Sequence, residues 1–257
     1  INCIRENGFA YTVRRAFWKL GNKLSRMDAK LSRFKLYGLL SWLPRMIFRC
    51  VRAVVKHGPG YPFRALYVKC LQKFGGKNPL VSVIMPTYNA EASILMAISS
   101  VQAQTLTDWE LIVLDDASTD HTCSIVMKIA EKDNRIKTYF FEKNRGVAIV
   151  RNQGLALSRG RYIAFLDSDD SWHPQKLEKQ LSNICATGAA LCYTSYALVK
   201  ENGSQAFPDY LVPERVDFDD LLKENVIGCS TVLASAELLK EHPFRPEFYH
   251  EDYVLWL

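Results

Sequence analysis

The residues Phe-Leu-Asp-Ser-Asp-Asp-Ser-Trp at positions 165–172 are the strongest single indication of the fold. They complete the apolar run Tyr-Ile-Ala-Phe-Leu at positions 162–166, which is short, aromatic and aliphatic, and is therefore typical of a buried strand. Three carboxylates follow within four positions. Because ligands of open α/β sheets bind at the carboxyl ends of strands, we expect Asp167 and Asp169 to lie at a ligand-binding edge.

Acids packed this closely repel one another, so without a partner at least one of them should have a raised pKa. A hard divalent cation removes the conflict, because Mg2+ or Mn2+ takes one or two protein carboxylates and completes its shell with water and substrate phosphate. The alternative is an acidic turn in which Asp170 or Ser171 caps the next helix. This stretch alone leaves both interpretations open.

Strand and helix patterns alternate four times along the middle of the chain. Short apolar runs predict strands at 81–85, 109–114, 136–141 and 162–166. Helical spacing predicts helices at 91–104, 120–133, 146–157 and 174–187. The alternation predicts an α/β fold with a parallel sheet and helices on both faces. Beyond it we expect a strand within 190–199, short helices at 218–224 and 236–242, and the end of a strand at 232–233.

Polar residues follow each predicted strand, which right-handed crossovers bring to one edge of the sheet. Any one of these segments could be a helix cap, as for residues 118–120 before the second helix. Four such ends at one edge favour a binding site. The first strand is not followed by Gly-x-Gly-x-x-Gly, and no P-loop is present, which excludes those two phosphate-binding motifs.

The charges divide the chain into two parts. The 257 residues carry a net charge of +6, but residues 1–79 hold 17 Lys/Arg and 2 Asp/Glu, whereas residues 80–257 hold 16 and 25. This asymmetry predicts a basic, mainly helical N-terminal arm, residues 1–79, and an acidic globular domain, residues 80–257. The break at 75–79, Gly-Gly-Lys-Asn-Pro, is the expected boundary.

Within the arm, residues 45–56 have helical spacing, with Arg45, Arg49, Arg52 and Lys56 on one stripe and apolar residues opposite. Such a basic amphipathic helix either contacts an anionic membrane surface peripherally or packs as part of a hairpin on the domain. The arm contains no apolar run long enough to span a bilayer. No recognised nucleic-acid-binding motif occurs, so we do not expect nucleic acid as a partner.

Seven cysteines are scattered without a Cys-x-x-Cys pair, which suits a reducing compartment. We therefore expect a cytoplasmic protein, at the inner face of the membrane if the arm binds there. The first residue is not Met, and positions 253–257 look like the start of a helix. Both ends are therefore expected to be cut from a longer chain.

Four motifs occur in a recognisable order: Val-Ser-Val-Ile-Met-Pro-Thr-Tyr-Asn at 81–89, Leu-Ile-Val-Leu-Asp-Asp-Ala-Ser-Thr-Asp at 111–120, Asn-Arg-Gly-Val-Ala-Ile-Val-Arg-Asn-Gln-Gly at 144–154 and Phe-Leu-Asp-Ser-Asp-Asp at 165–170. Together they resemble glycosyltransferase family 2 over about residues 80–257. The resemblance implies the GT-A fold, a Rossmann-like, mostly parallel sheet flanked by helices. It also implies an inverting, hexosyltransferase-type enzyme that takes a sugar from a nucleotide diphosphate donor.

The resemblance also assigns roles residue by residue. Residues bordering the nucleoside or lying near the donor would be Pro86, Tyr88, Asn89, Asp115, Arg145, Arg151, Asp167 and Ser168. Asp115 would read the base, because a carboxylate accepts a hydrogen bond from the imide N–H of uracil. Arg151 either approaches donor oxygens or forms a structural ion pair. Asp169 would be the metal ligand for Mn2+ or Mg2+, and Asp116 would support the turn beside Asp115.

The last motif, His-Glu-Asp-Tyr-Val-Leu-Trp at 250–256, resembles the family's Glu-Asp near the acceptor. It implies Asp252 as the catalytic base, with Glu251 as the alternative. An acceptor hydroxyl needs such a carboxylate to take its proton as the new C–O bond forms. The competing interpretation is a helix N-terminus enriched in acids. Ala117 stands where glycine is frequent in the family, and the chain stops at Leu257 where the family usually continues.

The sequence therefore predicts a metal-assisted transferase that uses a nucleotide-sugar, with UDP-sugar favoured, and a glycan or lipid-linked acceptor in bacterial surface-polysaccharide synthesis. One alternative is a non-catalytic nucleotide-sugar-binding or scaffold protein derived from the same fold. Another is a nucleotidyltransferase, but these usually carry a Gly-rich, basic loop after the first strand. Residues 86–89, Pro-Thr-Tyr-Asn, do not fit such a loop.

Overall fold

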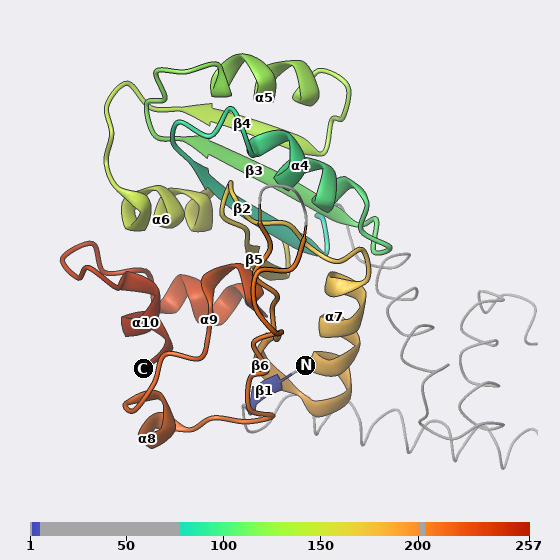
Figure 1. Cartoon of the computed structure of the whole chain (residues 1–257), viewed down its shortest axis with the longest axis vertical. Helices are drawn as coiled ribbons and strands as arrows, with labels where there is room; N and C mark the ends of the chain where they lie inside the picture. Colours follow the sequence, from blue (N-terminus) through green and yellow to red (C-terminus); the bar gives the residue numbers. More distant parts are fainter. Residues whose placement is uncertain (1, 6–77, 201–203) are drawn as a thin grey trace, which may run out of the picture.

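The computed structural model describes residues 2–5, 78–200 and 204–257. Its strands form one seven-stranded sheet in the order β1-β6-β7-β5-β2-β3-β4 (Figure 1). The strands are β1 (Asn2–Arg5), β2 (Val81–Thr87), β3 (Trp109–Asp115), β4 (Ile136–Phe140), β5 (Tyr162–Phe165), β6 (Ala189–Tyr193) and β7 (Leu233–Ser235). The helices are α4 (Ile94–Gln102), α5 (Thr122–Ala130), α6 (Val147–Leu157), α7 (Lys176–Thr187), α8 (Phe218–Leu221), α9 (Ala236–Glu241) and α10 (Glu251–Trp256), with the 3-10 turn η1 (Cys229–Thr231).

The four predicted strands form the parallel part of the sheet. β2 pairs with β3 on one side and with β5 on the other, and β4 extends the sheet beyond β3, all in parallel. The register sets Thr87 beside Asp115 and Ile84 beside Phe165. Because these strands run the same way, their carboxyl ends meet at one edge, as the sequence predicts.

Helices cover both faces of the sheet, because successive residues of its buried strands point to opposite sides. In β2, Val83 and Met85 pack with apolar residues of α4, α5 and α7, whereas Ile84 packs with those of α6, α8, α9 and α10. In Figure 1, α6, α9 and α10 lie to the left of the strands and α4 and α7 to the right. The mostly parallel α/β architecture expected from the sequence is thus confirmed.

Close packing of α6 on the sheet depends on one glycine. A Cβ atom added at Gly154 would lie 2.5 Å from Cγ2 of Ile84 in β2. A side chain at this position would push the helix away from the strand. Gly154 therefore fixes the height of α6 above the sheet, and with it the position of Arg151 one turn earlier.

The second half of the chain completes the sheet with antiparallel strands. β7 lies between β5 and β6 and is antiparallel to both. The predicted strand end at 232–233 and the predicted short helices appear as β7, α8 and α9, and β6 is shorter than the 190–199 segment expected. No pattern in the sequence predicted that β7 would insert between β5 and β6.

The predicted basic arm is described only at its start. Residues 2–5 form β1, which pairs antiparallel with β6, although the sequence predicts a mainly helical arm. The amphipathic segment 45–56 and the boundary motif up to residue 77 lie outside the described residues. Within the part of the chain that is described, no helix has the length and apolar character needed to cross a bilayer.

Candidate active site

Asp115 ends β3 and is almost fully buried, with 1% of its surface exposed. Its Oδ1 accepts a hydrogen bond from the backbone N–H of Ser118 at 2.9 Å, and its Oδ2 accepts one from the Ser118 hydroxyl at 2.5 Å. Both carboxylate oxygens are therefore engaged by the turn that follows the strand. Each oxygen has a second lone pair, so the group can still accept a hydrogen bond from a ligand.

The turn after Asp115 contains a residue in an unusual conformation. Ala117 has a φ of 67°, in the left-handed region that favours glycine. This is the position where the family frequently has glycine, so the departure noted in the sequence falls on a backbone geometry that glycine suits better.

Asp116 fastens the end of β3 to the start of α6. Its Oδ1 accepts from the backbone N–H of Arg145 at 2.8 Å, and its Oδ2 from that of Gly146 at 2.9 Å. Its own N–H donates to the carbonyl of Thr87 at the end of β2. These contacts agree with the supporting role that the sequence suggested for Asp116.

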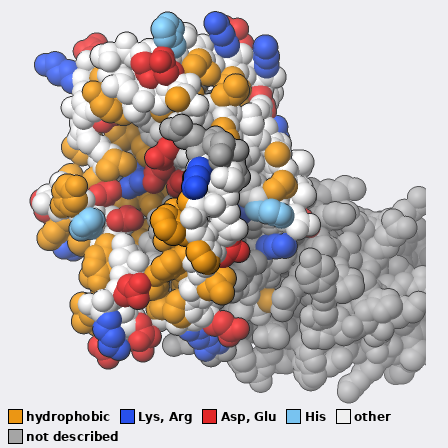
Figure 2. All heavy atoms as spheres, in the orientation of Figure 1, with side chains coloured by type: hydrophobic (Ala, Val, Ile, Leu, Met, Phe, Trp, Pro, Cys, Tyr) orange, Lys and Arg blue, Asp and Glu red, His pale blue; other side chains and the backbone are white. Residues whose placement is uncertain are grey.

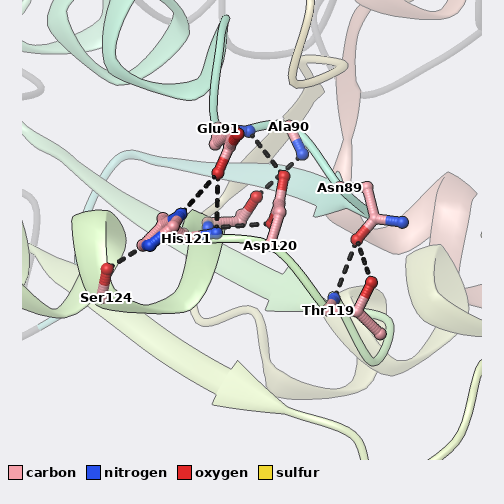
Figure 3. A network of polar contacts seen from close by, with 8 residues as sticks. Asn89, Ala90, Glu91, Thr119, Asp120, His121 and Ser124 are labelled. Carbon is pink, nitrogen blue, oxygen red and sulfur yellow. Dashed lines mark hydrogen bonds and ion pairs between the residues drawn. The ribbon is translucent and has the colours of Figure 1, made fainter.

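The loops after β2 and β3 are joined by a polar network (Figure 3). Asn89 accepts a hydrogen bond from the N–H of Thr119 at 2.8 Å and donates its own N–H to the Ser118 hydroxyl at 2.8 Å. Further out, Glu91 Oε2 accepts from the N–H of His121 and lies 2.9 Å from its Nδ1, while Asp120 Oδ2 accepts from the N–H of Glu91. The sequence suggested only a helix cap for residues 118–120, and it missed these contacts between loops about 30 residues apart.

Three further residues predicted to lie near the donor, Pro86, Tyr88 and Arg145, differ in exposure. Pro86 is buried within β2 beside Leu114. Tyr88 is half exposed and lies directly after the strand. The Arg145 guanidinium lies over the Phe141 ring, 4.7 Å from its centre, while its backbone is held by Asp116. Tyr88 and Arg145 therefore present an aromatic and a cationic side chain at the strand ends.

Arg151 on α6 is a buried cation between two acids. Its Nη2 donates to Asp167 Oδ1 at 2.6 Å and its Nη1 to Glu251 Oε1 at 2.6 Å. Burial alone would lower the pKa of Arg151, but Cys229, Asp167 and Glu251 favour the charged form more strongly, so the pKa is raised. Of the two roles left open by the sequence, the structure shows the ion pair.

The turn after β5 carries three acids: Asp167, Asp169 and Asp170. The N–H of Asp170 donates to the carbonyl of Asp167 at 3.1 Å and closes the turn, with Ser168 and Asp169 between them. Burial raises the pKa of Asp170, and the charges of Asp167 and Asp169 add to the effect while a hydrogen bond with Ser230 opposes it. Asp169 is exposed, and no described residue forms a hydrogen bond with its carboxylate.

This turn can bind a divalent cation only if a substrate and water supply most of the ligands. Among the described residues, no group of three or more His, Cys, Asp or Glu side chains is arranged to bind a metal ion. Mg2+ and Mn2+ do not need such a group when a substrate supplies phosphate oxygens, because one or two carboxylates and water complete their shell. The exposed carboxylate of Asp169 fits that requirement, with Asp167 beside it.

The C-terminal helix α10 brings the last predicted residues to the same place. Glu251 is buried and held by Arg151, whereas Asp252 is half-buried and accepts only the N–H of Tyr253, through Oδ1 at 2.8 Å, among the described residues. Burial raises the pKa of the Cys229 thiol, and Asp167, Asp252 and Glu251 add to the effect. The acids of α10 and Asp167 therefore lie close enough to one buried thiol to act on it electrostatically.

The predicted residues fall into two neighbouring groups at one edge of the sheet. Asp115 and Asn89 follow β3 and β2, whereas Asp167, Arg151 and Asp252 gather at the end of β5, on the other side of β2. In Figure 2, acidic side chains gather with a basic one in a hollow of this face. Sequence reasoning missed Ser230, whose hydroxyl accepts the N–H of Asp167 at 3.0 Å, because 63 residues separate the two.

The fold and the strand-end acids define an α/β protein of the GT-A type, in which a ligand-binding edge carries clustered carboxylates. The chain belongs to glycosyl transferase family 2, since the sequence model of that family matches residues 82–238. The resemblance seen in the sequence and the prediction of a glycosyltransferase are thereby confirmed.

Two relatives illustrate the similarity. The chain is 40% identical over 180 residues to the putative teichuronic acid biosynthesis glycosyltransferase TuaG of Bacillus subtilis, covering 70% of this chain and 71% of that protein. It is 43% identical over 179 residues to the UDP-Glc:alpha-D-GlcNAc-diphosphoundecaprenol beta-1,3-glucosyltransferase WfgD of Escherichia coli, covering 69% of this chain and 68% of that protein.

Solved structures share the fold. The structure of S. aureus TarS 1-349 in complex with UDP superposes with a TM-score of 0.56 at 29% identity, covering 68% of this chain and 53% of TarS 1-349. The chain thus spans about half the length of that structure. The mannosyltransferase PcManGT from Pyrobaculum calidifontis, in complex with GDP-Man and Mn2+, has a TM-score of 0.54 at 19% identity, covering 82% of this chain and 61% of PcManGT. At that identity the likeness concerns the fold alone.

Proposed function

We propose that this protein transfers a sugar from a UDP-sugar to a hydroxyl group of a glycan or lipid-linked acceptor, with inversion at the anomeric carbon. The observation that carries the proposal is the cluster at the end of β5. Asp169, whose carboxylate has no hydrogen bond to a described residue, lies beside Asp167, and Arg151 connects Asp167 to the helix that carries Asp252. The relative WfgD is named for a UDP-Glc donor and a diphosphoundecaprenol acceptor, and TarS is solved with UDP.

The donor is proposed to lie along the strand ends. Asp115, held by the two hydrogen bonds from Ser118, accepts the imide N–H of uracil, and Pro86, Tyr88 and Asn89 border the nucleoside. The exposed guanidinium of Arg145 attracts the diphosphate. Asp167 and Ser168 lie next to the ribose. The network between the β2 and β3 loops supports this arrangement, because it holds Asp115 and Asn89 in place before the donor binds.

Asp169 is the proposed ligand of Mn2+ or Mg2+, with Asp167 beside it. A divalent cation bound there supplies positive charge that stabilises the leaving diphosphate. The exposed position of Asp169, together with the absence of a hydrogen bond to any described residue, supports this role. Arg151 pairs with Asp167 and Glu251 and so holds these acids in place near the donor.

Asp252 is the proposed base. Its carboxylate takes the proton of the acceptor hydroxyl as the acceptor oxygen attacks the anomeric carbon, and the bond between that carbon and the diphosphate breaks on the opposite face. The electron pair of the broken bond leaves with UDP. Glu251 is the weaker candidate because Arg151 holds it in a buried ion pair. No described residue reaches the second carboxylate oxygen of Asp252, which supports its availability for a proton.

A panel of UDP-sugars, incubated with the protein, Mn2+ and a diphosphoundecaprenol-linked acceptor, tests the proposal. Release of UDP that depends on the acceptor, together with an elongated acceptor in the mass spectrum, is the expected result. Binding of UDP without hydrolysis or transfer of any sugar would instead identify a nucleotide-sugar-binding scaffold. GDP-sugars serve as the matched control, because guanine does not present the same imide edge to Asp115.

The division into an arm, residues 1–79, and a transferase domain, residues 80–257, remains a proposal, as does peripheral membrane contact by the arm. Its support is the excess of Lys/Arg in the first 79 residues. A fragment of residues 1–79 should sediment with anionic vesicles at low salt and be released at high salt. If it stays in the supernatant at low salt, the arm does not bind the membrane by charge.

A further inference from the structure

Ser230 contacts the chain at the start of the acidic turn and just beyond its end. The turn begins at Asp167, whose N–H donates to the Ser230 hydroxyl oxygen at 3.0 Å. It closes at Asp170, whose N–H donates to the carbonyl of Asp167 at 3.1 Å. Just beyond the turn, the indole N–H of Trp172 donates to the backbone carbonyl of Ser230 at 2.8 Å. One residue of η1 therefore holds a segment that lies about 60 positions earlier in the sequence.

The two contacts of Ser230 hold the chain on either side of Asp169. Its hydroxyl oxygen accepts the N–H of Asp167 at the start of the turn, and its carbonyl accepts the indole N–H of Trp172 beyond the end. Ser168 and Asp169 lie between these two points, so the backbone that aims the Asp169 carboxylate is held on both sides.

Buried polar groups of α7 fix η1 in turn. The Gln180 side chain is fully buried and donates from Nε2 to the carbonyls of Thr231 at 2.8 Å and Cys192 at 3.0 Å. Lys176 donates to Gln180 Oε1 at 2.8 Å, and its ammonium lies 4.1 Å from the centre of the Trp172 ring. Buried hydrogen bonds therefore hold η1, and Ser230 with it, in place, as is needed for a residue that positions another.

The acids of the turn have different surroundings. Arg151 neutralises Asp167, and the backbone N–H of Asp170 closes the turn on the carbonyl of Asp167. Asp169 lies between them, is exposed, and has no hydrogen bond from its carboxylate to a described residue. The carboxylate of Asp169 is therefore open to a ligand, whereas that of Asp167 is held by Arg151.

We propose that Ser230 is a positioning residue for the cation-binding turn: its hydroxyl accepts the N–H of Asp167, its carbonyl accepts the indole N–H of Trp172, and together these contacts aim the carboxylate of Asp169. This inference rests on the proposed function, in which Asp169 binds the divalent cation. It adds a residue to which the four family motifs gave no clue. It also predicts that loss of the hydroxyl weakens cation binding without weakening nucleotide binding that is independent of the cation.

The test compares Ser230→Ala with Ser230→Thr, which keeps a hydroxyl, and with the distant control Ser100→Ala. Ser100 donates its hydroxyl to the carbonyl of Ala97 within α4, so its loss removes one hydroxyl hydrogen bond away from the turn. UDP binding is measured by calorimetry without metal and at increasing Mn2+. For Ser230→Ala we expect the Mn2+ concentration at half-maximal effect to rise by about tenfold, which corresponds to the loss of one hydrogen bond at the upper end of the usual range. Metal-free UDP affinity should not change, and Ser230→Thr and Ser100→Ala should keep the wild-type midpoint.

If Ser230→Ala keeps the wild-type Mn2+ midpoint while the wild-type protein responds to Mn2+, the positioning role is overturned and the proposed function stands. If the wild-type protein binds UDP equally with and without Mn2+, the proposed metal role fails, and this inference fails with it. Should Ser230→Ala not fold, Ser230→Thr and Ser230→Val form a pair of similar volume that differ in the hydroxyl. Equal midpoints for those two variants would also overturn the positioning role.

Discussion

Two acidic strand ends in the same sheet are built differently. After β3, Asp115 and Asp116 are both buried, and all four of their carboxylate oxygens accept hydrogen bonds from neighbouring N–H or O–H groups. After β5, Asp167 keeps a third of its side chain exposed and pairs with Arg151, while Asp169 is exposed and has no hydrogen bond to a described residue. The two ends share a residue type and a position at the sheet edge but differ in how completely their charges are satisfied.

The difference separates two tasks of a carboxylate. A group whose oxygens already accept backbone N–H bonds shapes the loop around it, and moving it would break those bonds at a cost. A group left open can coordinate a cation or accept a proton. We infer that the β3 end holds a preformed surface for the nucleotide base, whereas the β5 end and α10 supply the groups that react or bind metal.

The largest effect is expected at Asp252, which lies on α10 near the β5 end, where the acids are left open to react or to bind metal. Asp252→Asn should lower the turnover number by about 10^3-fold, in the range lost when a positioned general base is removed. UDP affinity should be retained, because Asp252 lies on α10 and not on the β3 end. Steady-state transfer and calorimetry measure the two quantities, with Asp219→Asn on the exposed start of α8 as the control. Retained turnover in Asp252→Asn would refute its role.

Substitution of Asp116 tests the β3 end, where the carboxylate oxygens accept hydrogen bonds from the loop. Asp116→Ala should lower the free energy of unfolding by about 3 kcal/mol, because it deprives two backbone N–H groups of their acceptor in a partly buried site. Urea unfolding measures the change. Asp116→Asn keeps one acceptor oxygen and should lose less. A loss no larger than that of Asp219→Ala would show that the contacts of Asp116 do not hold the loop.

Substitution of Ser118 would remove hydrogen bonds that hold the loop at the β3 end. Ser118→Ala removes the hydroxyl that donates to Asp115 and accepts the N–H of Asn89. We expect a loss of about 1 kcal/mol in stability, the usual net value of a hydrogen bond, together with weaker binding of UDP. Unfolding and calorimetry on the same variant provide the test. Unchanged UDP affinity would mean that the preformed loop does not contribute to nucleotide binding.

Ala117 gives the smallest expected effect. Its φ of 67° costs a non-glycine residue about 1 kcal/mol, but glycine also gains freedom in the unfolded chain, so Ala117→Gly should stabilise the protein by less than about 1 kcal/mol. Ala103→Gly is the matched control, since φ there is −78° and glycine should destabilise. Thermal unfolding measures both. Equal destabilisation by the two changes would show that no strain is stored at Ala117.

Much of the fold could be predicted because its signals are local. The apolar runs at 81–85 and 109–114 became β2 and β3 with ends shifted by one or two residues, and helical spacing located α4 to α7. The strand-end acids could be placed at one edge because the alternation of strand and helix implies parallel strands. The family motifs then supplied candidate roles for residues that composition and spacing alone could not assign.

The rest depends on contacts between distant positions, which leave no local pattern. Arg151 and Glu251 are 100 residues apart, and neither neighbourhood reveals the ion pair. The insertion of β7 between β5 and β6 rests on a strand of three residues, too short to show periodicity. The bridge from Ser230 to the acidic turn exists only because that insertion brings η1 beside the end of β5.

We expect the acids after β5, and not those after β3, to bind a cation together with the nucleotide. Calorimetric titration of UDP into the wild-type protein and Asp169→Asn, each with and without Mn2+, measures this difference. Mn2+ should strengthen UDP binding to the wild-type protein and have no effect on Asp169→Asn, while the metal-free affinities agree. Equal enhancement by Mn2+ in both proteins, or none in the wild-type protein, would contradict it.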